Sequence, residues 1–334
     1  MLHPATIIYH GECPDGFGAA YAAWRRYGAR ADYVPMHHGE PWHPLGLADR
    51  DVSILDFSFP PDELIAMAEV ARSVYLLDHH ATARSPWADM LEPAPGAESL
   101  AIHRHPELPL TVAFDLDKSG ARLGWEHFHP TEPLPLALAH IEDQDLWRFR
   151  LPETRPFCRA LRLQPYDFEA WDRIVRQADS PESPLHRDMV REGEAIEGFC
   201  ALEVERLGNS SLVMPVSLKG EPVDSLQALR HGLPIITDPE GNWRAVSGLA
   251  INANGAFASD LGNHLAQRSG TFGLIWQLGS NGDVRASLRA CGRVDVAAMA
   301  QNYGGGGHPN AAGFRMPLQR FIDEVLNASV PPSV

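Results

Sequence analysis

Cysteine is scarce in this sequence. Its 334 residues include four cysteines, Cys13, Cys158, Cys200 and Cys291. No two of them stand in a CxxC pair, so the spacing indicates neither a zinc ribbon nor a disulfide framework. Stability must therefore come from buried apolar cores, and a chain of this length with 44% hydrophobic residues has the material for two domains.

Long apolar runs are also lacking. No stretch approaches the roughly 20 apolar residues of a membrane-spanning helix. The apolar run within MLHPATIIYH at the amino terminus is too short for a signal peptide. We therefore expect a cytoplasmic protein without membrane insertion.

Positive charge is the third shortage. The 28 Lys and Arg residues face 43 Asp and Glu residues, which gives a net charge of −15. Long nucleic acid is bound along basic grooves, so we expect no long duplex partner. A small anionic nucleotide or a short oligonucleotide is still compatible with this net charge, because bound divalent cations can dominate the electrostatic field at a binding site. The acidity otherwise serves solubility.

The stretch YLLDHHATA places polar residues directly after an apolar run. The run Val74–Leu77 is typical of a buried parallel strand. Asp78, His79 and His80 would then lie at the carboxyl end of this strand, where open α/β sheets bind ligands. A carboxylate beside two imidazoles suits Mn, Fe, Co or Zn. The alternative is a turn in which polar residues are adjacent by chance.

Two earlier strands end on similar residue types. The run ATIIY leads into a loop with His10, Cys13 and Asp15, followed by a helix expected over Ala19–Tyr27, and the run DVSILDF carries Asp56 near its end. Together with the DHH stretch, these ends predict one crevice lined by carboxylates and imidazoles, and their repulsion favours bound cations. The alternative for the first loop is a plain strand-to-helix turn capped by Asp15.

A further acidic segment, IEDQDLWRF, offers Asp143 and Asp145. One of these carboxylates could bridge two metal ions as a shared ligand. Equally, both could be solvent-facing charges at a helix end, and the residues alone leave this open.

The chain changes character after Gly208. Residues 188–207 predict a long connecting helix, and beyond it strands alternate with helices and include a hairpin at SNGD. Four consecutive glycines, 304–307, could offer backbone NH groups to an anion ahead of a further helix, with His308 beside them. Arg289, at a strand end, is a candidate phosphate clamp. The alternative for the glycines is a flexible loop.

The order of these segments predicts an α/β protein of two domains. We expect a parallel-sheet domain over residues 1–185, a helical linker over 186–208 and a smaller mixed-sheet domain over 209–330. Residues 86–109 are expected to form an irregular connection, and residues 329–334 a disordered end. We also consider a homodimer.

These segments together resemble the DHH phosphoesterase superfamily with its DHH-associated carboxy-terminal domain. The resemblance covers nearly the whole chain. It rests on the DHH tripeptide after a strand, the acidic residues at earlier strand ends, the Asp143 segment and GGGGHPNAAGF near the carboxy terminus. DHH and GGGGH in this order, roughly 220 residues apart, are a far more specific signal than the tripeptide alone.

The resemblance implies an activity. The superfamily includes RecJ-like exonucleases, nano-RNases, phosphoadenosine-phosphate phosphatases and cyclic-dinucleotide phosphodiesterases, which use two divalent metals, usually manganese. For this chain it implies a metal-dependent phosphoesterase that acts on short oligonucleotides or small nucleotides. The implied cofactors are two divalent ions, Mn²⁺ first, with Zn²⁺, Fe²⁺, Co²⁺ or Mg²⁺ as alternatives.

The resemblance also implies the site residues. The implied metal ligands are His10, Asp15, Asp56, Asp78, His79 and Asp143, with Cys13 and Asp145 as further candidates. The implied catalytic residues are Asp78 and His80, of which His80 contacts the scissile phosphate. The implied substrate clamp is Arg289, Gly305, Gly306, Gly307 and His308.

One position departs from the family pattern. The family's first motif carries two aspartates separated by one residue, and here the first is replaced by Cys13 in CPDG. Cys13 could bind metal and shift the preference toward zinc or iron. One metal could instead be weakly held, or His10 could supply the missing ligand, which we favour. The departure also keeps a weak or inactive nucleotide-binding or sensory protein in view, beside a small-molecule phosphatase or pyrophosphatase.

Overall fold

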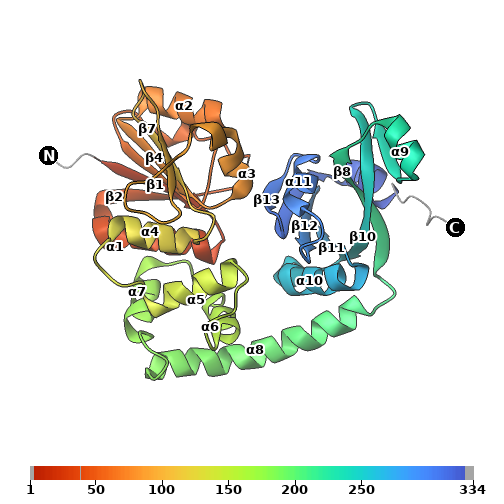
Figure 1. Ribbon diagram of the computed structural model, residues 1–334. Helices are drawn as coiled ribbons and strands as arrows, with labels where there is room; N and C mark the ends of the chain where they lie inside the picture. Colours follow the sequence, from red (N-terminus) through yellow and green to blue (C-terminus); the bar gives the residue numbers. More distant parts are fainter. Residues whose placement is uncertain (1–3, 38, 328–334) are drawn as a thin grey trace. The chain divides into compact units, whose positions relative to one another are not determined.

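The computed structural model describes residues 4–37 and 39–327, and the chain divides into two compact units, Met1–Glu197 and Gly198–Val334 (Figure 1). Each unit has its own seven-stranded sheet, which confirms the predicted α/β class. Within the described residues, no helix is both long and apolar enough to cross a membrane. The end predicted to be disordered, 329–334, lies outside the described residues.

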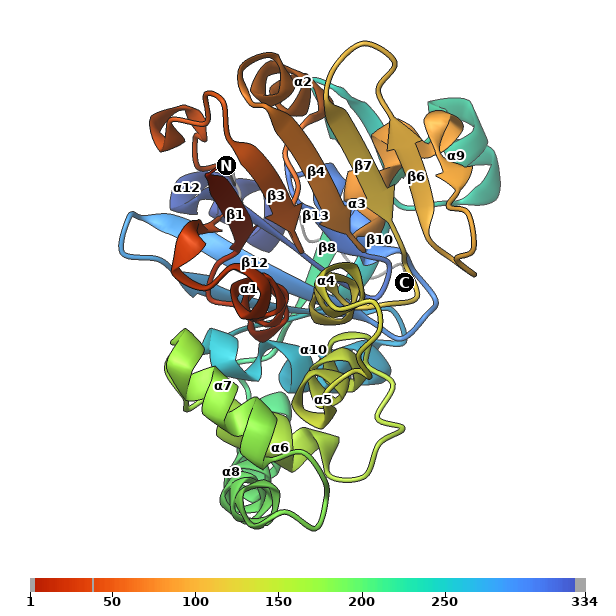
Figure 2. The ribbon, with the colours of Figure 1, turned by 90° about the vertical axis from the view of Figure 1, so that its left-hand side faces the viewer.

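The first unit is built on a mainly parallel sheet with the strand order β2-β1-β3-β4-β7-β6-β5 (Figure 2). Its parallel strands are β1 (Ala5–His10), β2 (Ala31–Met36), β3 (Asp51–Leu55), β4 (Ser73–Asp78) and β7 (Leu110–Phe114). The antiparallel edge is β6 (Ala101–Arg104) with β5 (Glu92–Pro93). The chain passes from β1 to β2 on one side and returns to β3 on the other. The carboxyl ends of β1 and β3 thus flank the switch point where open α/β sheets bind ligands.

Helices cover both faces of this sheet, which explains why its central strands bury apolar residues on both faces. Ile7 belongs to the core under α1 and α4, whereas its neighbour Ile8 belongs to the core under α2. Helices α1 and α4 approach closely, since a Cβ at Gly124 would lie 2.9 Å from the Cα of Ala19. The helices of this unit are α1 (Pro14–Tyr27), α2 (Pro61–Val70), α3 (Ala81–Arg84), α4 (Gly120–Phe128), α5 (Leu136–Asp145), α6 (Thr154–Leu161) and α7 (Phe168–Gln177).

Two sequence predictions for this unit need correction. Helix α1 begins at Pro14 rather than Ala19, because proline suits the first position of a helix and the glycines that follow are tolerated. Residues 86–109 are not wholly irregular. They contain β5 and β6, and β6 forms an antiparallel pair with β7, a strand that the sequence pattern does not predict. Both pairings join neighbouring segments of the chain, so the miss comes from the prolines and polar residues of this stretch, which do not show the apolar pattern of a strand.

Helix α8 (Pro184–Gly208) covers the residues predicted as the connecting helix, and the division between the two units falls within it. The domain boundaries at 185 and 208 stay predictions.

The second unit is built on a mixed sheet with the order β13-β14-β12-β11-β10-β8, and β9 pairs with β10. Only β10 and β11 run parallel among these pairs, and β11 and β12 form the predicted hairpin. The strands are β8 (Met214–Pro222), β9 (Ile235–Asp238), β10 (Gly241–Asn252), β11 (Phe272–Leu278), β12 (Asp283–Ala290), β13 (Gly306–His308) and β14 (Ala311–Pro317). The helices are α9 (Ser225–His231), α10 (Ala258–Ser269), α11 (Val296–Gln301) and α12 (Leu318–Phe321).

The glycine run takes a different form from the one predicted. Its last two residues and His308 form the edge strand β13, and the strand β14 follows where a helix was expected. A Cβ at Gly305 would lie 2.1 Å from the carbonyl oxygen of Gly313, so the backbone is pressed against β14. The glycines therefore serve close packing of two strands, a requirement that the sequence pattern does not distinguish from flexibility.

Candidate metal centre

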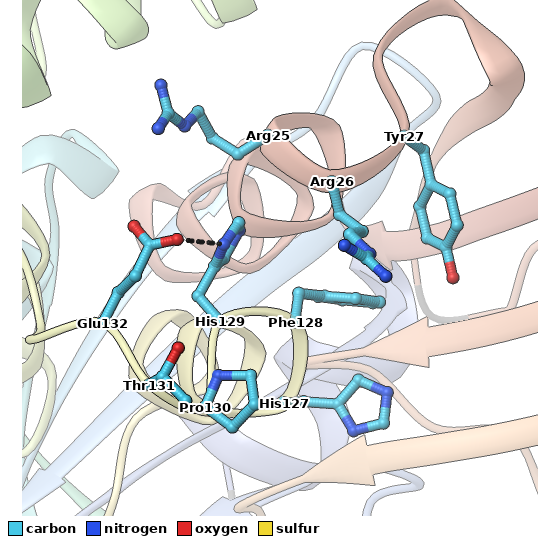
Figure 3. Close-up of a pocket in the computed structure, with 9 residues that line it drawn as sticks. All are labelled: Arg25, Arg26, Tyr27, His127, Phe128, His129, Pro130, Thr131 and Glu132. Carbon is cyan, nitrogen blue, oxygen red and sulfur yellow. Dashed lines mark hydrogen bonds and ion pairs between the residues drawn. The ribbon is translucent and has the colours of Figure 1, made fainter.

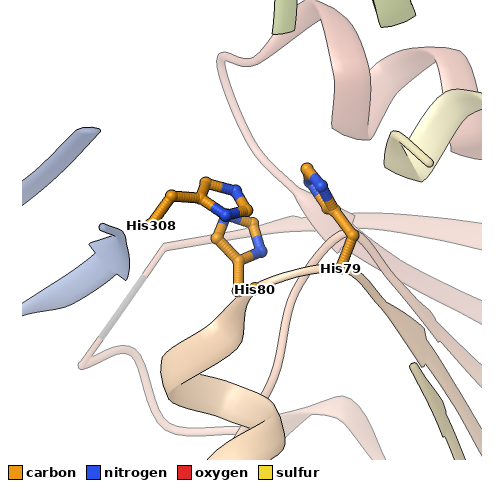
Figure 4. A group of neighbouring side chains, drawn as sticks. All are labelled: His79, His80 and His308. Carbon is orange, nitrogen blue, oxygen red and sulfur yellow. The ribbon is translucent and has the colours of Figure 1, made fainter. Parts of the chain in front are cut away.

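Carboxylates and imidazoles gather at the carboxyl ends of β1, β3 and β4. Asp78 is the last residue of β4, and His79 and His80 follow it before α3 begins. Figure 4 shows the rings of His79 and His80 leaving this short connection. Asp56 comes directly after β3, and Asp15 lies in the first turn of α1 after β1. The sheet topology thus brings together residues that are far apart in the sequence.

The ring of His79 lies at the middle of this cluster. Its Nε2 atom is 3.0 Å from Oδ1 of Asp56, 3.5 Å from Oδ2 of Asp15 and 3.7 Å from Oδ2 of Asp145. His79, Asp15 and Asp56 are almost fully buried, while Asp145 reaches in from the exposed end of α5. Three carboxylates therefore surround one ring nitrogen.

Asp78 holds the ring of His80. Its Oδ1 accepts a hydrogen bond from Nδ1 of His80 at 2.7 Å and another from the backbone NH of His79 at 2.8 Å. Its other oxygen, Oδ2, is buried and accepts no hydrogen bond from the part of the chain that the structure describes. Such an orphaned carboxylate oxygen is costly unless a cation or water meets it.

Asp15 is anchored by the start of α4. Its two oxygens accept hydrogen bonds from the backbone NH groups of Gly120 and Ala121, at 2.6 and 2.9 Å. A Cβ at Gly120 would lie 2.5 Å from the Cβ of Asp56, so only glycine fits between these carboxylates. The side chain of Ser119 caps this helix and accepts a hydrogen bond from the backbone NH of Arg122. The sequence does not reveal that the next two residues support the carboxylate of Asp15.

Asp56 has a strained backbone and a second orphaned oxygen. Its φ of 52° lies in the left-handed region, which is unfavourable for residues other than glycine and is concentrated at functional sites. Its Oδ2 is buried without a hydrogen-bond donor among the described residues, and the nearest ion-pair contact is Nδ1 of His10 at 3.6 Å. Donor atoms of His10, Cys13 and Asp56 lie within 4.8 Å of one another.

The acidic segment contributes Asp145 to the cluster, whereas the sequence puts Asp143 first. The carboxylate of Asp143 accepts hydrogen bonds from the backbone NH groups of Arg150 and Leu151 and from the hydroxyl of Thr154, at 2.8, 3.0 and 2.7 Å. It therefore organises the loop between α5 and α6. The two aspartates stand two residues apart near the end of a helix, so their side chains point in different directions. The sequence alone does not show which of them faces the cluster.

The charges in the cluster perturb one another strongly. Burial would lower the pKa of His79, but its hydrogen bond to Asp56 and the surrounding carboxylates outweigh burial and raise that pKa well above the usual value. Burial and the neighbouring charges of Asp56 and Asp145 raise the pKa of Asp15 well above its usual range. The same two causes, burial and carboxylate charge, raise the pKa of the Cys13 thiol. A cluster with this much negative charge is stabilised by bound cations.

The donor set fits divalent metal ions. Within the first unit, three overlapping groups of donor atoms each lie within 4.8 Å of one another. They are Asp56 with Asp78, His79 and His80; His10 with Cys13 and Asp56; and Asp15 with His79 and Asp145. Carboxylate and imidazole donors suit Mn, Fe, Co and Zn. Such an ion would also offset the charge of the buried oxygens Oδ2 of Asp56 and Oδ2 of Asp78, which receive no hydrogen bond from the described residues.

The predicted substrate residues lie in the second unit, and two of them, Arg289 and His308, share one row of its sheet. Ala311 of β14 pairs with Arg289 of β12 on one side and with His308 of β13 on the other. The guanidinium of Arg289 donates to the hydroxyl of Ser259 at 2.9 Å and to the carbonyl of Leu288 at 2.8 Å. The structure thus brings Arg289 and His308 together within their unit.

A separate cavity of about 580 Å³ lies between the ends of α1 and α4 and contains none of the predicted site residues among its lining (Figure 3). Two of its polar side chains, His129 and Arg25, already have partners. The ring nitrogens of His129 contact the carbonyl of Ala22 and a carboxylate oxygen of Glu132, at 2.9 and 3.3 Å. Arg25 is bound to Asp172 at 3.0 Å. This cavity therefore does not compete with the carboxylate cluster as a candidate reactive site.

Comparison with known proteins places the second unit in a family. Residues 247–329 match the DHHA1 domain family. This match falls on the region predicted to be the DHH-associated domain and confirms the resemblance drawn from the sequence. The second unit thus contains a DHHA1 domain, and the DHH tripeptide at the end of β4 precedes it in the chain.

Individual proteins are similar over most of the chain. The uncharacterized protein R106 of Acanthamoeba polyphaga mimivirus is 30% identical over 330 residues. The match covers 92% of this chain and 66% of the length of R106.

Similar solved structures include an uncharacterized protein from Helicobacter pylori G27 (13% identity, TM-score 0.42, 94% of both chains) and RecJ from Thermus thermophilus in complex with Mn²⁺ (14%, 0.43, 96% of this chain and 50% of that one). A pGpG-specific phosphodiesterase, PggH, from Vibrio cholerae is similar at 13% identity and TM-score 0.41, over 95% of this chain and 94% of that one. At these values, the likenesses assign neither a substrate nor a residue role.

Proposed function

We propose that the protein is a metal-dependent phosphoesterase that hydrolyses short oligonucleotides or small nucleotides. The observation that carries this proposal is the cluster around His79 and Asp56, where buried carboxylates and imidazoles meet at the switch point of the sheet. A cluster of like charges is expensive to maintain unless cations bind it, and hydrolysis of a phosphoester is chemistry that divalent cations support.

The proposed ligands fall on four segments of the first unit. We propose Asp15, Asp56, Asp78 and His79 as ligands, with Asp145 in place of Asp143, because the carboxylate of Asp145 lies 3.7 Å from the ring of His79. His10 and Cys13 face the other side of Asp56. When bound, two divalent ions would supply a nucleophilic water at neutral pH and offset charge on the phosphoryl oxygens.

The protein's own contribution is positioning. Asp78 fixes the ring of His80 by accepting from Nδ1, so the opposite nitrogen, Nε2, is oriented for a phosphoryl oxygen. The backbone NH groups at the start of α4 hold the carboxylate of Asp15. The hydrogen bond between His79 and Asp56 holds the ring of His79. Groups held in this way need little rearrangement when the substrate binds.

The second unit is proposed to bind the remainder of the substrate. Arg289 and His308 share one row of the sheet and can present positive charge and hydrogen-bond donors to a second phosphate or a sugar. The net charge of −15 makes a long polyanion a poor substrate, so we propose a dinucleotide, a short oligomer or a nucleotide bisphosphate.

The test is product release from a panel of substrates in the presence of Mn²⁺. The panel contains oligoribonucleotides of increasing length, a linear dinucleotide and a nucleotide bisphosphate. We expect mononucleotides from the dinucleotide and the short oligomers. Asp78→Asn should lower the rate by about 100-fold or more, whereas Asp89→Asn, at an exposed position, should leave it unchanged.

Other outcomes redirect the proposal. Release of inorganic phosphate from the bisphosphate alone would indicate a small-molecule phosphatase that uses the same site. Wild-type turnover by folded Asp78→Asn protein would contradict the proposed site. No turnover with any substrate, together with measurable nucleotide binding, would indicate the binding or sensory protein that the substitution at position 13 raises.

A further inference from the structure

Cys13 lies beside the carboxylate cluster, at a position that a carboxylate would ordinarily fill better. It is the N-cap residue of α1, with extended dihedral angles of φ −121° and ψ 128°. Asp, Asn, Ser and Thr are the preferred residues there, and cysteine is not among them. Helix capping therefore gives no reason for a thiol at this place.

The surroundings of Cys13 give a reason for a thiol at this position. Its Sγ atom, a ring nitrogen of His10 and a carboxylate oxygen of Asp56 lie within 4.8 Å of one another. Independently of the cysteine, Oδ2 of Asp56 is buried, with the side chain 2% exposed, and receives no hydrogen bond from the described residues. Nδ1 of His10 approaches this oxygen only to 3.6 Å, a separation that leaves its lone pairs available to a cation.

The two sides of Asp56 differ in chemistry. On one side, His10 and Cys13 add an imidazole and a sulfur, a donor set that suits zinc, ferrous iron or cobalt. On the other side, Asp15 and Asp145 add oxygens around His79, a donor set that manganese accepts readily. Asp56 places an oxygen toward each side, with Oδ1 near His79 and Oδ2 near His10.

We propose that the centre is asymmetric. In this proposal, the Cys13 thiolate is a ligand of one ion and makes the subsite formed by His10, Cys13 and Asp56 selective for a softer metal, such as Zn²⁺. The subsite formed by Asp15, His79 and Asp145 takes a harder ion, such as Mn²⁺. Binding exchanges the thiol proton for the metal and releases that proton to solvent. The inference rests on the proposed function for its biological context, but not for its test.

Cobalt substitution tests directly whether the Cys13 sulfur binds a metal ion. Metal-free protein is titrated with Co²⁺, and the near-ultraviolet sulfur-to-cobalt charge-transfer band is followed. We expect the band to saturate at one cobalt per chain. Cys13→Ser should abolish it while the visible ligand-field bands of the second cobalt persist. Cys291→Ser, which removes an exposed thiol of the second unit, is the matched control and should retain the full band.

Metal preference gives a second readout. In competition experiments, Cys13→Asp should lower the preference of this subsite for Zn²⁺ over Mn²⁺ by about ten-fold or more, because a carboxylate replaces the soft ligand. Circular dichroism verifies that both variants are folded. If wild type and Cys13→Ser gave the same cobalt spectrum, Cys13 would not be a ligand and the inference would be overturned.

The two proposals can fail separately. A charge-transfer band without hydrolysis of any substrate supports the Cys13 ligand and counts against the phosphoesterase. Hydrolysis in Mn²⁺ without a charge-transfer band in Co²⁺ supports the phosphoesterase and counts against the Cys13 ligand.

Discussion

At the scale of single residues, Asp143 and Asp145 have different surroundings: the first supports a loop, and the second faces the carboxylate cluster. Asp143 accepts three hydrogen bonds from the loop after α5, whereas Asp145 faces the ring of His79. The two residues are the same in type and nearly adjacent in sequence. Their contacts therefore predict opposite consequences for the same substitution.

We expect Asp145→Asn to weaken divalent metal binding by about 10- to 100-fold with little loss of stability. Asp143→Asn should instead lower the free energy of unfolding by about 1–3 kcal/mol, because it leaves buried donors of the loop without a charged acceptor. Isothermal titration with Mn²⁺ and urea denaturation measure the two effects. A loss of metal affinity confined to Asp143→Asn would restore the ranking drawn from the sequence.

Gly120 is a second residue with a sharp prediction. A Cβ there would lie 2.5 Å from the Cβ of Asp56, so Gly120→Ala must push apart two metal-facing segments. We expect a loss of about 1–3 kcal/mol in the free energy of unfolding and weaker metal binding. Chemical denaturation and metal titration measure both.

Gly198→Ala is the matched control for this substitution. Gly198 lies inside α8, and a Cβ there would meet no atom within 4 Å among the described residues. Helix propensity predicts a stabilisation of about 0.5–1 kcal/mol. Equal effects of the two substitutions would show that the close approach of Gly120 to Asp56 is unimportant.

At the scale of elements, a pair of buried histidines joins α8 to α5. Nε2 of His140 lies 3.1 Å from Nε2 of His186, and Nδ1 of His140 lies 3.0 Å from the hydroxyl of Thr154 at the start of α6. One ring must donate to the other, so the contact requires at least one neutral ring. Burial and the neighbouring His186 lower the pKa of His140 from 6.5 to about 4.

This shift predicts a pH dependence of stability. Between about 4 and 6.5 the unfolded chain binds the proton that folded His140 excludes, so stability is fully present above pH 6.5 and falls as the pH decreases toward 4. The contribution is about 1–3 kcal/mol. His140→Asn should flatten the slope of unfolding free energy against pH in this window. Parallel profiles for wild type and variant would contradict the assignment.

At the scale of the whole molecule, bound metal and stability should be linked. Burial, together with the charges of Asp56 and Asp145, raises the pKa of Asp15, and the buried carboxylates repel one another without cations. We expect chelation to lower the melting temperature and added Mn²⁺ to raise it, with a gain of about 2.7 kcal/mol at a hundred times the dissociation constant. Thermal scans with and without chelator test this. Asp56→Asn should show a smaller response, and an unchanged wild-type melting temperature would contradict metal binding.

Much of this architecture is readable from local sequence patterns. Apolar runs that end on Asp or His predicted β1, β3 and β4 and the residues at their ends, because strand burial and the residue after a strand are local properties. The pairing of β11 with β12 was likewise predictable from the turn residues between them. The order of DHH and GGGGH indicated a DHH-associated domain, and the DHHA1 match over residues 247–329 confirmed that domain.

Other features depend on contacts between distant segments, and only the tertiary structure decided them. These are the choice of Asp145 over Asp143 at His79, the support of Asp15 by α4, and the close packing of the glycine run against β14. The sequence by itself determined which residue types reach the edge of the sheet. Which of them meet was decided by the strand order and the helix crossings, because a distance across the fold has no counterpart in sequence spacing.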